Sequence, residues 1–326
     1  MPKVSVVIPT YNYGHFLGEA IQSVLDQTFS DFELIIVDDG STDNTKEVVS
    51  SFQDKRVKYI YQKNRGLAAS RNTGIKASSG EYIAFLDSDD KWLPENLEVM
   101  VNRLDSRPDI ALVCSDVNVY DDATGAILGR HWHNRRSDSW VNPKKAARRA
   151  LQYLLKRGCF ITPIAMVVRR TVFAEVGHYD ESVRTHEDWD MIVRIVMRFP
   201  IETIDVPLAL NRKHGISLQS NREQMYREAI IVLNKTLNRN SLSANDQALL
   251  RRRVARTHFR YGRDLLVNGD ITAGREKLLT AVRTNPWSVR PYLYLALSLL
   301  GNRVIVSIKT WKHTMRAPMR STTNID

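Results

Sequence analysis

Short apolar runs and helical patterns alternate along the first half of the chain. Apolar runs of strand length begin at Val4, Glu33, Val57 and Tyr82, and a fifth covers 110–114. Between these runs, apolar residues recur at helical spacings of three and four, so helices are expected there. Repeated strand–helix units predict an α/β fold of Rossmann-like type, with a mainly parallel sheet and helices on both faces. Ligands of such sheets gather at the carboxyl ends of the strands.

After about residue 222 the pattern becomes helical throughout. Residues 261–300 resemble one tetratricopeptide-type helix pair and the start of another. Because roughly three such repeats are needed for stability, a single pair should pack on neighbouring helices. The pattern predicts an α/β domain at 1–221, an all-α C-terminal region at 222–314, and a disordered tail at 315–326.

Basic residues are concentrated in the second half of the chain. The net charge is +11, yet from Arg212 onward 21 Lys and Arg face only 7 Asp and Glu, an excess of 14. At spacings of three and four, Arg253, Arg256, Arg260 and Arg263 would share one helical face. Such a face attracts anionic lipid head groups, so an anionic membrane surface is the partner considered, and no nucleic acid is expected. The alternative is a solvated basic face without a ligand.

The cysteine content and the first residues of the chain bear on where in the cell the protein is located. Cys114 and Cys159 lie in apolar surroundings and are expected to be buried free thiols, not a disulfide or a zinc site. Met1 leads directly into a strand, so no signal peptide is predicted. No run reaches the ~18 apolar residues of a spanning helix. We predict a cytoplasmic protein, with peripheral contact to the inner face of the membrane as an extension of that prediction.

Three carboxylates within four positions follow the strand that begins at Tyr82. Asp87, Asp89 and Asp90 would repel one another there, and a divalent cation is the simplest way to offset that cost. An Asp-x-Asp pair with few other protein ligands suits Mg²⁺ or Mn²⁺, which keep water and accept phosphate oxygens. The alternative is an acidic turn that caps the helix opened by Pro94.

Polar residues also end the first two strands, at 9–12 and at Asp38-Asp39. Three such strand ends should meet at one edge of the sheet. Asn12 fits a turn residue equally well, and Ser41 or Asp43 fits a helix cap. Asp39 lies ahead of those capping candidates, so capping does not account for it.

These motifs resemble those of family 2 glycosyltransferases. The resemblance rests on segments 4–12, 37–41, 64–72 and 80–90 and on Glu187-Asp188, and it covers residues 1 to about 220. It implies a GT-A fold and a nucleotide-diphosphate sugar donor, with UDP favoured as the carrier. By resemblance, the metal is Mn²⁺ or Mg²⁺, held by Asp87, Asp89 and His214. The nucleotide-binding residues that it implies are Pro9, Thr10, Tyr11, Asn12, Asp39, Arg71, Asp87 and Ser88.

The chemistry requires a base for the incoming hydroxyl. By resemblance that base is Asp188, and its place ahead of the apolar helix 191–196 favours the ionised carboxylate. Its alternative role is a partner of the helix dipole alone. One base and no evident carboxylate nucleophile favour a single displacement with inversion. Glu187 and Trp189 are tentative acceptor-side residues, although a helical Trp is more often part of the core.

The remaining features concern the acceptor and the competing functions. No Gln-x-x-Arg-Trp motif of processive synthases is present, so transfer of one sugar to a glycan or lipid-linked acceptor is expected. Residues 121–149 are a surface loop or an acceptor-side insertion. A sugar nucleotidyltransferase would carry a glycine- and Lys/Arg-rich phosphate loop after the first strand, and 9–12 is not one. A non-enzymatic adaptor acting through the helical tail is the other alternative.

Overall fold

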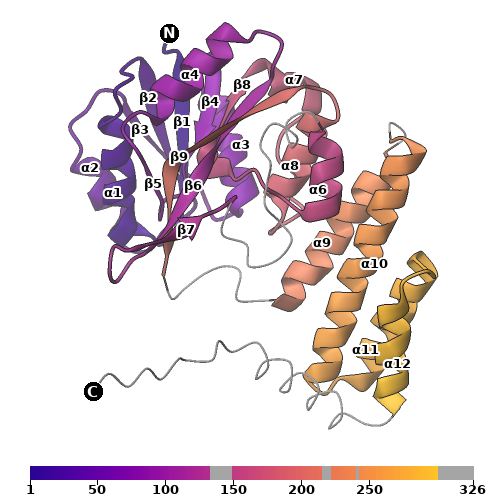
Figure 1. Ribbon diagram of the computed structural model, residues 1–326. Helices are drawn as coiled ribbons and strands as arrows, with labels where there is room; N and C mark the ends of the chain where they lie inside the picture. Colours follow the sequence, from indigo (N-terminus) through magenta and orange to yellow (C-terminus); the bar gives the residue numbers. More distant parts are fainter. Residues whose placement is uncertain (133–148, 215–221, 240–241, 300–326) are drawn as a thin grey trace, which may run out of the picture. The chain divides into compact units, whose positions relative to one another are not determined.

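The computed structural model describes residues 1–132, 149–214, 222–239 and 242–299. The chain divides into two compact units between Asn221 and Arg222 (Figure 1). Within the described ranges, no helix combines the length and the apolar content needed to cross a bilayer. Both cysteines are free, with Cys114 buried and Cys159 half-buried.

The first unit alternates strands and helices, as the apolar pattern predicts. Its strands are β1 (Val4–Thr10), β2 (Phe32–Asp38), β3 (Val57–Tyr61), β4 (Tyr82–Phe85), β5 (Lys91–Trp92), β6 (Leu112–Asp121), β7 (Ile127–Arg130), β8 (Met166–Arg169) and β9 (Ile201–Lys213). Its helices are α1 (Gly14–Leu25), α2 (Thr45–Ser50), α3 (Leu67–Ala77), α4 (Asn96–Ser106), α6 (Ala150–Arg157), α7 (Thr171–Val176) and α8 (Glu187–Val196), with a 3₁₀ turn at Pro163–Ala165.

The described strands form one sheet of nine, in the order β3-β2-β1-β4-β8-β6-β9-β5 with β7 beside β6. The strands β3, β2, β1 and β4 are parallel, whereas β8 is antiparallel to both β4 and β6. The α/β prediction is confirmed. The sheet is mixed because β8, a four-residue strand that the sequence pattern missed, enters its middle, and because β5 and β7 pair antiparallel with β9 and β6. The strand expected at 110–114 runs on to Asp121.

Helices cover both faces of this sheet (Figure 1). Val4, Val6 and Ile8 pack in one core cluster with residues of α1 and α4. Val7, which points to the other face, meets Gly74 of α3. A Cβ at Gly74 would lie 2.2 Å from Val7 Cγ1, so α3 approaches β1 more closely than a side chain would allow. This contact places the residues of α3 beside the strand ends.

The segment expected to be a loop or insertion at 121–149 contains structure in its described part. It holds β7, and Trp132 is 1% exposed with its Nε1 donating to the carbonyl of Phe160 at 2.7 Å. Trp132 therefore belongs to the core, which corrects the expectation of a surface loop there. Residues 133–148 lie outside the described residues.

The second unit is helical in its described part, with α9 (Arg222–Leu237), α10 (Ala244–Val267), α11 (Ile271–Thr284) and α12 (Val289–Leu299). A Cβ at Gly262 would lie 2.7 Å from the carbonyl oxygen of Gly274, so this glycine pair brings α10 and α11 together. The predicted basic face on α10 is exposed at Arg256 and Arg260, whereas Arg263 is half-buried and pairs with Asp264. The tail predicted at 315–326 lies outside the described residues.

Candidate functional site

The three predicted strand ends lie at one edge of the sheet. Strand β1 pairs in parallel with β2 on one side and β4 on the other, with Thr10 opposite Asp38 and Val7 opposite Phe85. The carboxyl ends of these strands therefore bring the segments 10–12, 38–41 and 86–90 together. Strand β9 reaches the same region at its end, where Asn211 contacts Asp90.

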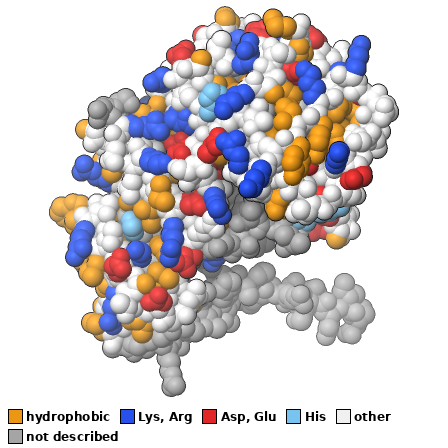
Figure 2. Space-filling view, turned by 180° about the vertical axis from the view of Figure 1, so that it is seen from behind, with side chains coloured by type: hydrophobic (Ala, Val, Ile, Leu, Met, Phe, Trp, Pro, Cys, Tyr) orange, Lys and Arg blue, Asp and Glu red, His pale blue; other side chains and the backbone are white. Residues whose placement is uncertain are grey.

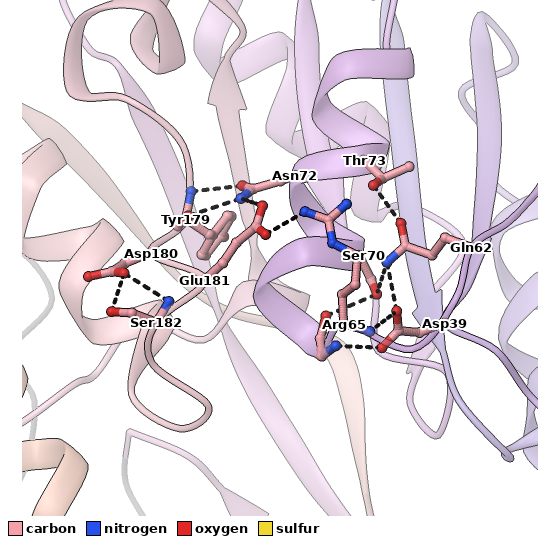
Figure 3. A network of polar contacts seen from close by, with 11 residues as sticks. Asp39, Gln62, Arg65, Ser70, Asn72, Thr73, Tyr179, Asp180, Glu181 and Ser182 are labelled. Carbon is pink, nitrogen blue, oxygen red and sulfur yellow. Dashed lines mark hydrogen bonds and ion pairs between the residues drawn. The ribbon is translucent and has the colours of Figure 1, made fainter.

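Asp39 is held by the segment that leads into α3 (Figure 3). Its carboxylate accepts from the backbone N–H groups of Arg65 at 3.0 Å and Gly66 at 2.7 Å, and from Gln62 Nε2 at 2.6 Å. Asp39 thus holds the two residues that precede α3, 26 and 27 positions along the chain. Both N–H groups lie before Leu67, the first residue of α3, so the statement that helix capping does not account for Asp39 stays a prediction. A carboxylate offers about four acceptor positions. Three are used here, which leaves one for a ligand N–H.

Two of the predicted residues on the first strand end serve the fold. Pro9 is buried within β1. Asn12 adopts a left-handed backbone with φ of 56°, and its side-chain oxygen accepts from the N–H of Thr42 at 2.8 Å. The contacts of Asn12 therefore agree with its interpretation as a turn residue.

The other two predicted residues at this end, Thr10 and Tyr11, differ in exposure. Thr10 is 3% exposed, and its hydroxyl has no partner within the described residues, while Tyr11 is 47% exposed. A buried hydroxyl without a partner is costly, so a ligand group at this position would be favoured.

Arg71 joins two carboxylates from distant parts of the chain. It is 2% exposed, its Nη2 donates to Asp87 at 2.9 Å, and its Nη1 donates to Glu187 at 2.7 Å. Burial would lower the pKa of Arg71, but the charges of Asp87, Glu187 and Asp188 raise it. This guanidinium therefore gathers the acidic segment after β4 and the start of α8 around one positive charge.

The start of α8 carries the predicted base and its neighbours. Asp188 is half-buried, and its Oδ1 accepts from the N–H of Trp189 at 2.6 Å. Burial raises the pKa of Glu187 to about 7, with Arg71 acting in the opposite direction. Glu187 is turned to Arg71 and Trp189 is 3% exposed. The tentative acceptor-side placement of both residues is therefore corrected, and the burial of Trp189 confirms the core interpretation that a helical Trp favoured.

Two of the three predicted metal ligands lie side by side. His214 Nε2 is 3.0 Å from Asp89 Oδ2, whereas Asp87 is held by Arg71. In the part of the chain that the structure describes, no three His, Cys, Asp or Glu side chains are grouped to hold a metal. The predicted set of three is thus not assembled. A carboxylate and an imidazole still fit Mn²⁺ or Mg²⁺ if phosphate oxygens and water complete the shell.

The electrostatics of the acidic segment also fit an added cation. Burial, together with the charge of Asp87, raises the pKa of Asp89 above its ordinary value, although His214 lowers it. Burial and the charges of Asp89 and Asp87 raise the pKa of Asp90 well above its ordinary value. The ionised carboxylates are therefore under-compensated, and a positive charge would stabilise them. Ser88, the remaining predicted residue, is buried between them.

Two groups of residues at this edge escaped the sequence analysis. The buried residues Asp90 and Arg212 form a hydrogen-bonded set with the exposed Asn211, and 211–213 are part of β9. In Figure 3, Asn72 of α3 donates to Glu181 at 2.9 Å and so ties α3 to the segment that precedes α8. The signal that the sequence offered for the first group was Arg212, a charged residue two positions after the apolar run 208–210.

Comparisons with known proteins agree with this geometry. The model of the family described as Glycosyl transferase family 2 matches residues 5–177. An uncharacterized glycosyltransferase of Nostoc sp. is 33% identical over 220 residues, which cover 65% of each protein. The glycosyltransferase GlyG of Streptococcus pneumoniae is 30% identical over 257 residues, which cover 76% of this chain and 84% of GlyG. The chain spans just under two thirds of the length of the Nostoc relative.

Among solved structures, S. aureus TarS 1–349 in complex with UDP-GlcNAc is similar, with a TM-score of 0.67. The alignment covers 95% of this chain and 92% of that chain at 21% identity. At this identity the likeness is one of fold.

Proposed function

This chain belongs to glycosyltransferase family 2, and from that premise we propose that it transfers one sugar from a nucleotide-diphosphate donor to a hydroxyl group. Its first unit has the GT-A type of fold. The observation that carries the proposal is the meeting of three strand ends at one edge, where an incompletely bonded Asp39 and the Asp89–His214 pair lie. The donor favoured is a UDP-sugar, and the acceptor class is a glycan or lipid-linked molecule.

The donor would lie along the edge formed by β1, β2 and β4. The remaining acceptor position of Asp39 suits an N–H of the nucleobase, and Thr10 and Tyr11 lie on the neighbouring strand end. The TarS fold has been solved with UDP-GlcNAc, which supports a UDP-sugar as the first donor to test.

The Asp89–His214 pair would hold Mn²⁺ or Mg²⁺ in this reaction. When bound, the ion supplies positive charge to the diphosphate leaving group. Arg71 keeps the neighbouring Asp87 fixed and partly neutralised, so that one more carboxylate does not swing into the diphosphate site.

Asp188 would act as the general base. It takes the proton of the acceptor hydroxyl while that oxygen bonds to the anomeric carbon and the bond to the phosphate oxygen breaks, so the products are the inverted glycoside and the nucleoside diphosphate. Its place beside the buried Arg71–Glu187 pair, within the first turn of α8, supports this role because the helix start favours a carboxylate.

A donor screen tests the proposal. The full chain is incubated with a panel of nucleotide sugars and Mn²⁺, with and without candidate acceptors, and release of nucleoside diphosphate is measured. We expect release from one UDP-sugar that depends on the metal and increases with the correct acceptor. Pyrophosphate release from UTP and a sugar phosphate would show a nucleotidyltransferase instead. Absence of both reactions, together with capture of a protein through 222–299, would favour an adaptor.

We also propose a cytoplasmic location with contact to the inner face of the membrane. The basis is the excess of Lys and Arg in the C-terminal part of the chain. On the face seen in Figure 2, Lys and Arg side chains are dispersed among Asp and Glu, so any such contact would be diffuse. The protein should sediment with phosphatidylglycerol vesicles at low salt and be released by high salt. Equal binding to phosphatidylcholine vesicles, or none to either, would contradict this proposal.

A further inference from the structure

Arg212 has no part in the reaction proposed above, yet it is one of the most highly connected residues at this edge. It lies near the end of β9 and is 7% exposed. Its Nε donates to the backbone carbonyl of Asp89 at 2.8 Å, and its Nη2 donates to Glu19 of α1 at 2.9 Å. Its Nη1 donates to Asp122, which follows β6. One buried guanidinium on β9 therefore connects the acidic segment to α1 and to the segment after β6.

The backbone of Arg212 fixes the same segment from a second side. Its N–H donates to Asp90 Oδ1 at 2.8 Å, and Asn211 Nδ2 donates to the two oxygens of Asp90 at 3.0 and 3.1 Å. Asp90 is 2% exposed, so these hydrogen bonds offset the free-energy cost of burying its carboxyl group. The acidic turn is thus held to β9 both through the carbonyl of Asp89 and through the side chain of Asp90.

The same strand carries His214 to Asp89. His214 follows Arg212 by two residues, and its ring lies 5.0 Å from the ring of Phe16, centroid to centroid. The Arg212 guanidinium lies 4.5 Å from the centre of that same ring. Phe16 is therefore a shared support for Arg212 and His214, and the position of the imidazole follows the position of Arg212.

From these contacts we propose that Arg212 is a positioning residue that sets the separation of Asp89 and His214, and hence the affinity of their site for a divalent cation with a nucleoside diphosphate. The proposal deepens the proposed function and rests on it. A site with two protein ligands depends on their placement, and residues that orient metal ligands from outside commonly change affinity 10–100-fold when replaced. A lysine could keep the charge but not the planar set of donors that Arg212 uses.

Binding of Mn²⁺ in the presence of UDP, followed by electron paramagnetic resonance, tests the proposal without turnover. We expect Arg212→Lys to weaken Mn²⁺ binding by about 10–100-fold, and to raise the KM for the donor more than it lowers kcat at saturating metal. The matched control is Arg169→Lys. Arg169 likewise donates to backbone carbonyls, of Ile110 at 2.8 Å and Leu104 at 2.6 Å, but contacts none of the site residues named above. That variant should lower thermal stability and leave the Mn²⁺ affinity unchanged.

A milder variant covers the case in which Arg212→Lys does not fold. Glu19 is half exposed at its side chain and pairs with Arg212 and Lys91, so Glu19→Gln should fold and weaken Mn²⁺ binding by a smaller factor. Unchanged Mn²⁺ affinity in the folded Arg212 or Glu19 variant, or an equal loss in the Arg169 control, would overturn the positioning role. If the unmodified protein binds no Mn²⁺ with UDP, the metal part of the proposed function fails, and this inference fails with it.

Discussion

Replacing Glu33 with glutamine should destabilise the first unit without touching its proposed chemistry. Glu33 lies near the start of β2, at the end of the sheet opposite Asp39, and is 4% exposed. Its carboxylate accepts from Ser5 Oγ at 2.6 Å, from the N–H and Oγ of Ser79 at 2.7 and 2.8 Å, and from Lys58 Nζ at 2.6 Å. All four partner groups donate hydrogen bonds to this carboxylate. The amide N–H group of a glutamine would therefore face a group that also donates.

The magnitude follows from the pKa of this carboxyl group. Burial would raise the pKa of Glu33, but the hydrogen bonds from Lys58, Ser5 and Ser79 lower it from 4.5 to about 2. A pKa difference of this size corresponds to about 3 kcal/mol of stability at neutral pH. Because Lys58 is 55% exposed and its contribution is screened, we expect a loss of about 2–3 kcal/mol. For a domain of this size that corresponds to a fall in Tm of roughly 4–12 °C.

The pH dependence of the difference in Tm distinguishes loss of the carboxylate hydrogen bonds from loss of packing. A carboxylate with a lowered pKa stabilises the fold above the unfolded-state pKa of 4.5, and the stabilisation is lost as the pH falls through about 2. The gap in Tm between Glu33→Gln and the unmodified protein should therefore narrow between pH 5 and pH 3. Thermal melts followed by circular dichroism measure it, with Lys58→Met as a control expected to cost about 0–1 kcal/mol. Equal Tm values at pH 7, or a gap that is constant with pH, would refute the reasoning.

Three further predictions concern the site and the packing behind it. Asp89→Asn should abolish Mn²⁺-dependent donor binding with the fold intact, and near-normal turnover with a chelator present would contradict the metal assignment. Asp188→Asn should lower kcat by about 10²–10⁴-fold with the donor KM little changed, whereas lost donor binding with kcat preserved would place this residue in the nucleotide site. Gly74→Ala should cost about 1–3 kcal/mol in urea unfolding, because its Cβ would meet Val7 at 2.2 Å. Gly18→Ala, with Val48 at 3.7 Å, should be neutral or stabilising, and equal effects of the two changes would exclude the close packing as the cause.

The sequence predicted those features of the fold and the site that depend on residues close together in the chain. Strands β1 and β2 are mainly apolar runs that the structure buries completely, and the acidic motif directly follows a further apolar run at 82–86. The placement of the site at this edge needed only the rule that parallel strands end together. Asp89 could therefore be proposed from the residues alone, whereas Asp188 was proposed from the resemblance to family 2 glycosyltransferases.

The contacts that shape the site are not local and could not be predicted. Arg71 meets Glu187 across 116 positions, and the N–H of Arg212 meets Asp90 across 122. The strand conformation of 211–213 depends on the packing of the whole unit. A sequence pattern gives residue types and spacing, whereas the pairing of charges depends on which distant segments the fold brings together.

The bridge made by Arg71 links catalysis to cooperative unfolding. The buried guanidinium of Arg71 is shared by Asp87 and Glu187, so detaching α8 would remove Glu187 and leave the guanidinium with Asp87 as its one remaining carboxylate partner among these two. Partial opening at α8 should therefore be about as costly as opening α3, and the amide hydrogens of the two helices should exchange with solvent as one unit. We therefore expect no stable state in which α3 is intact and α8, which carries the proposed base Asp188, has moved away. Loss of activity on mild denaturation should then coincide with loss of α3, because the same ion pairs hold both.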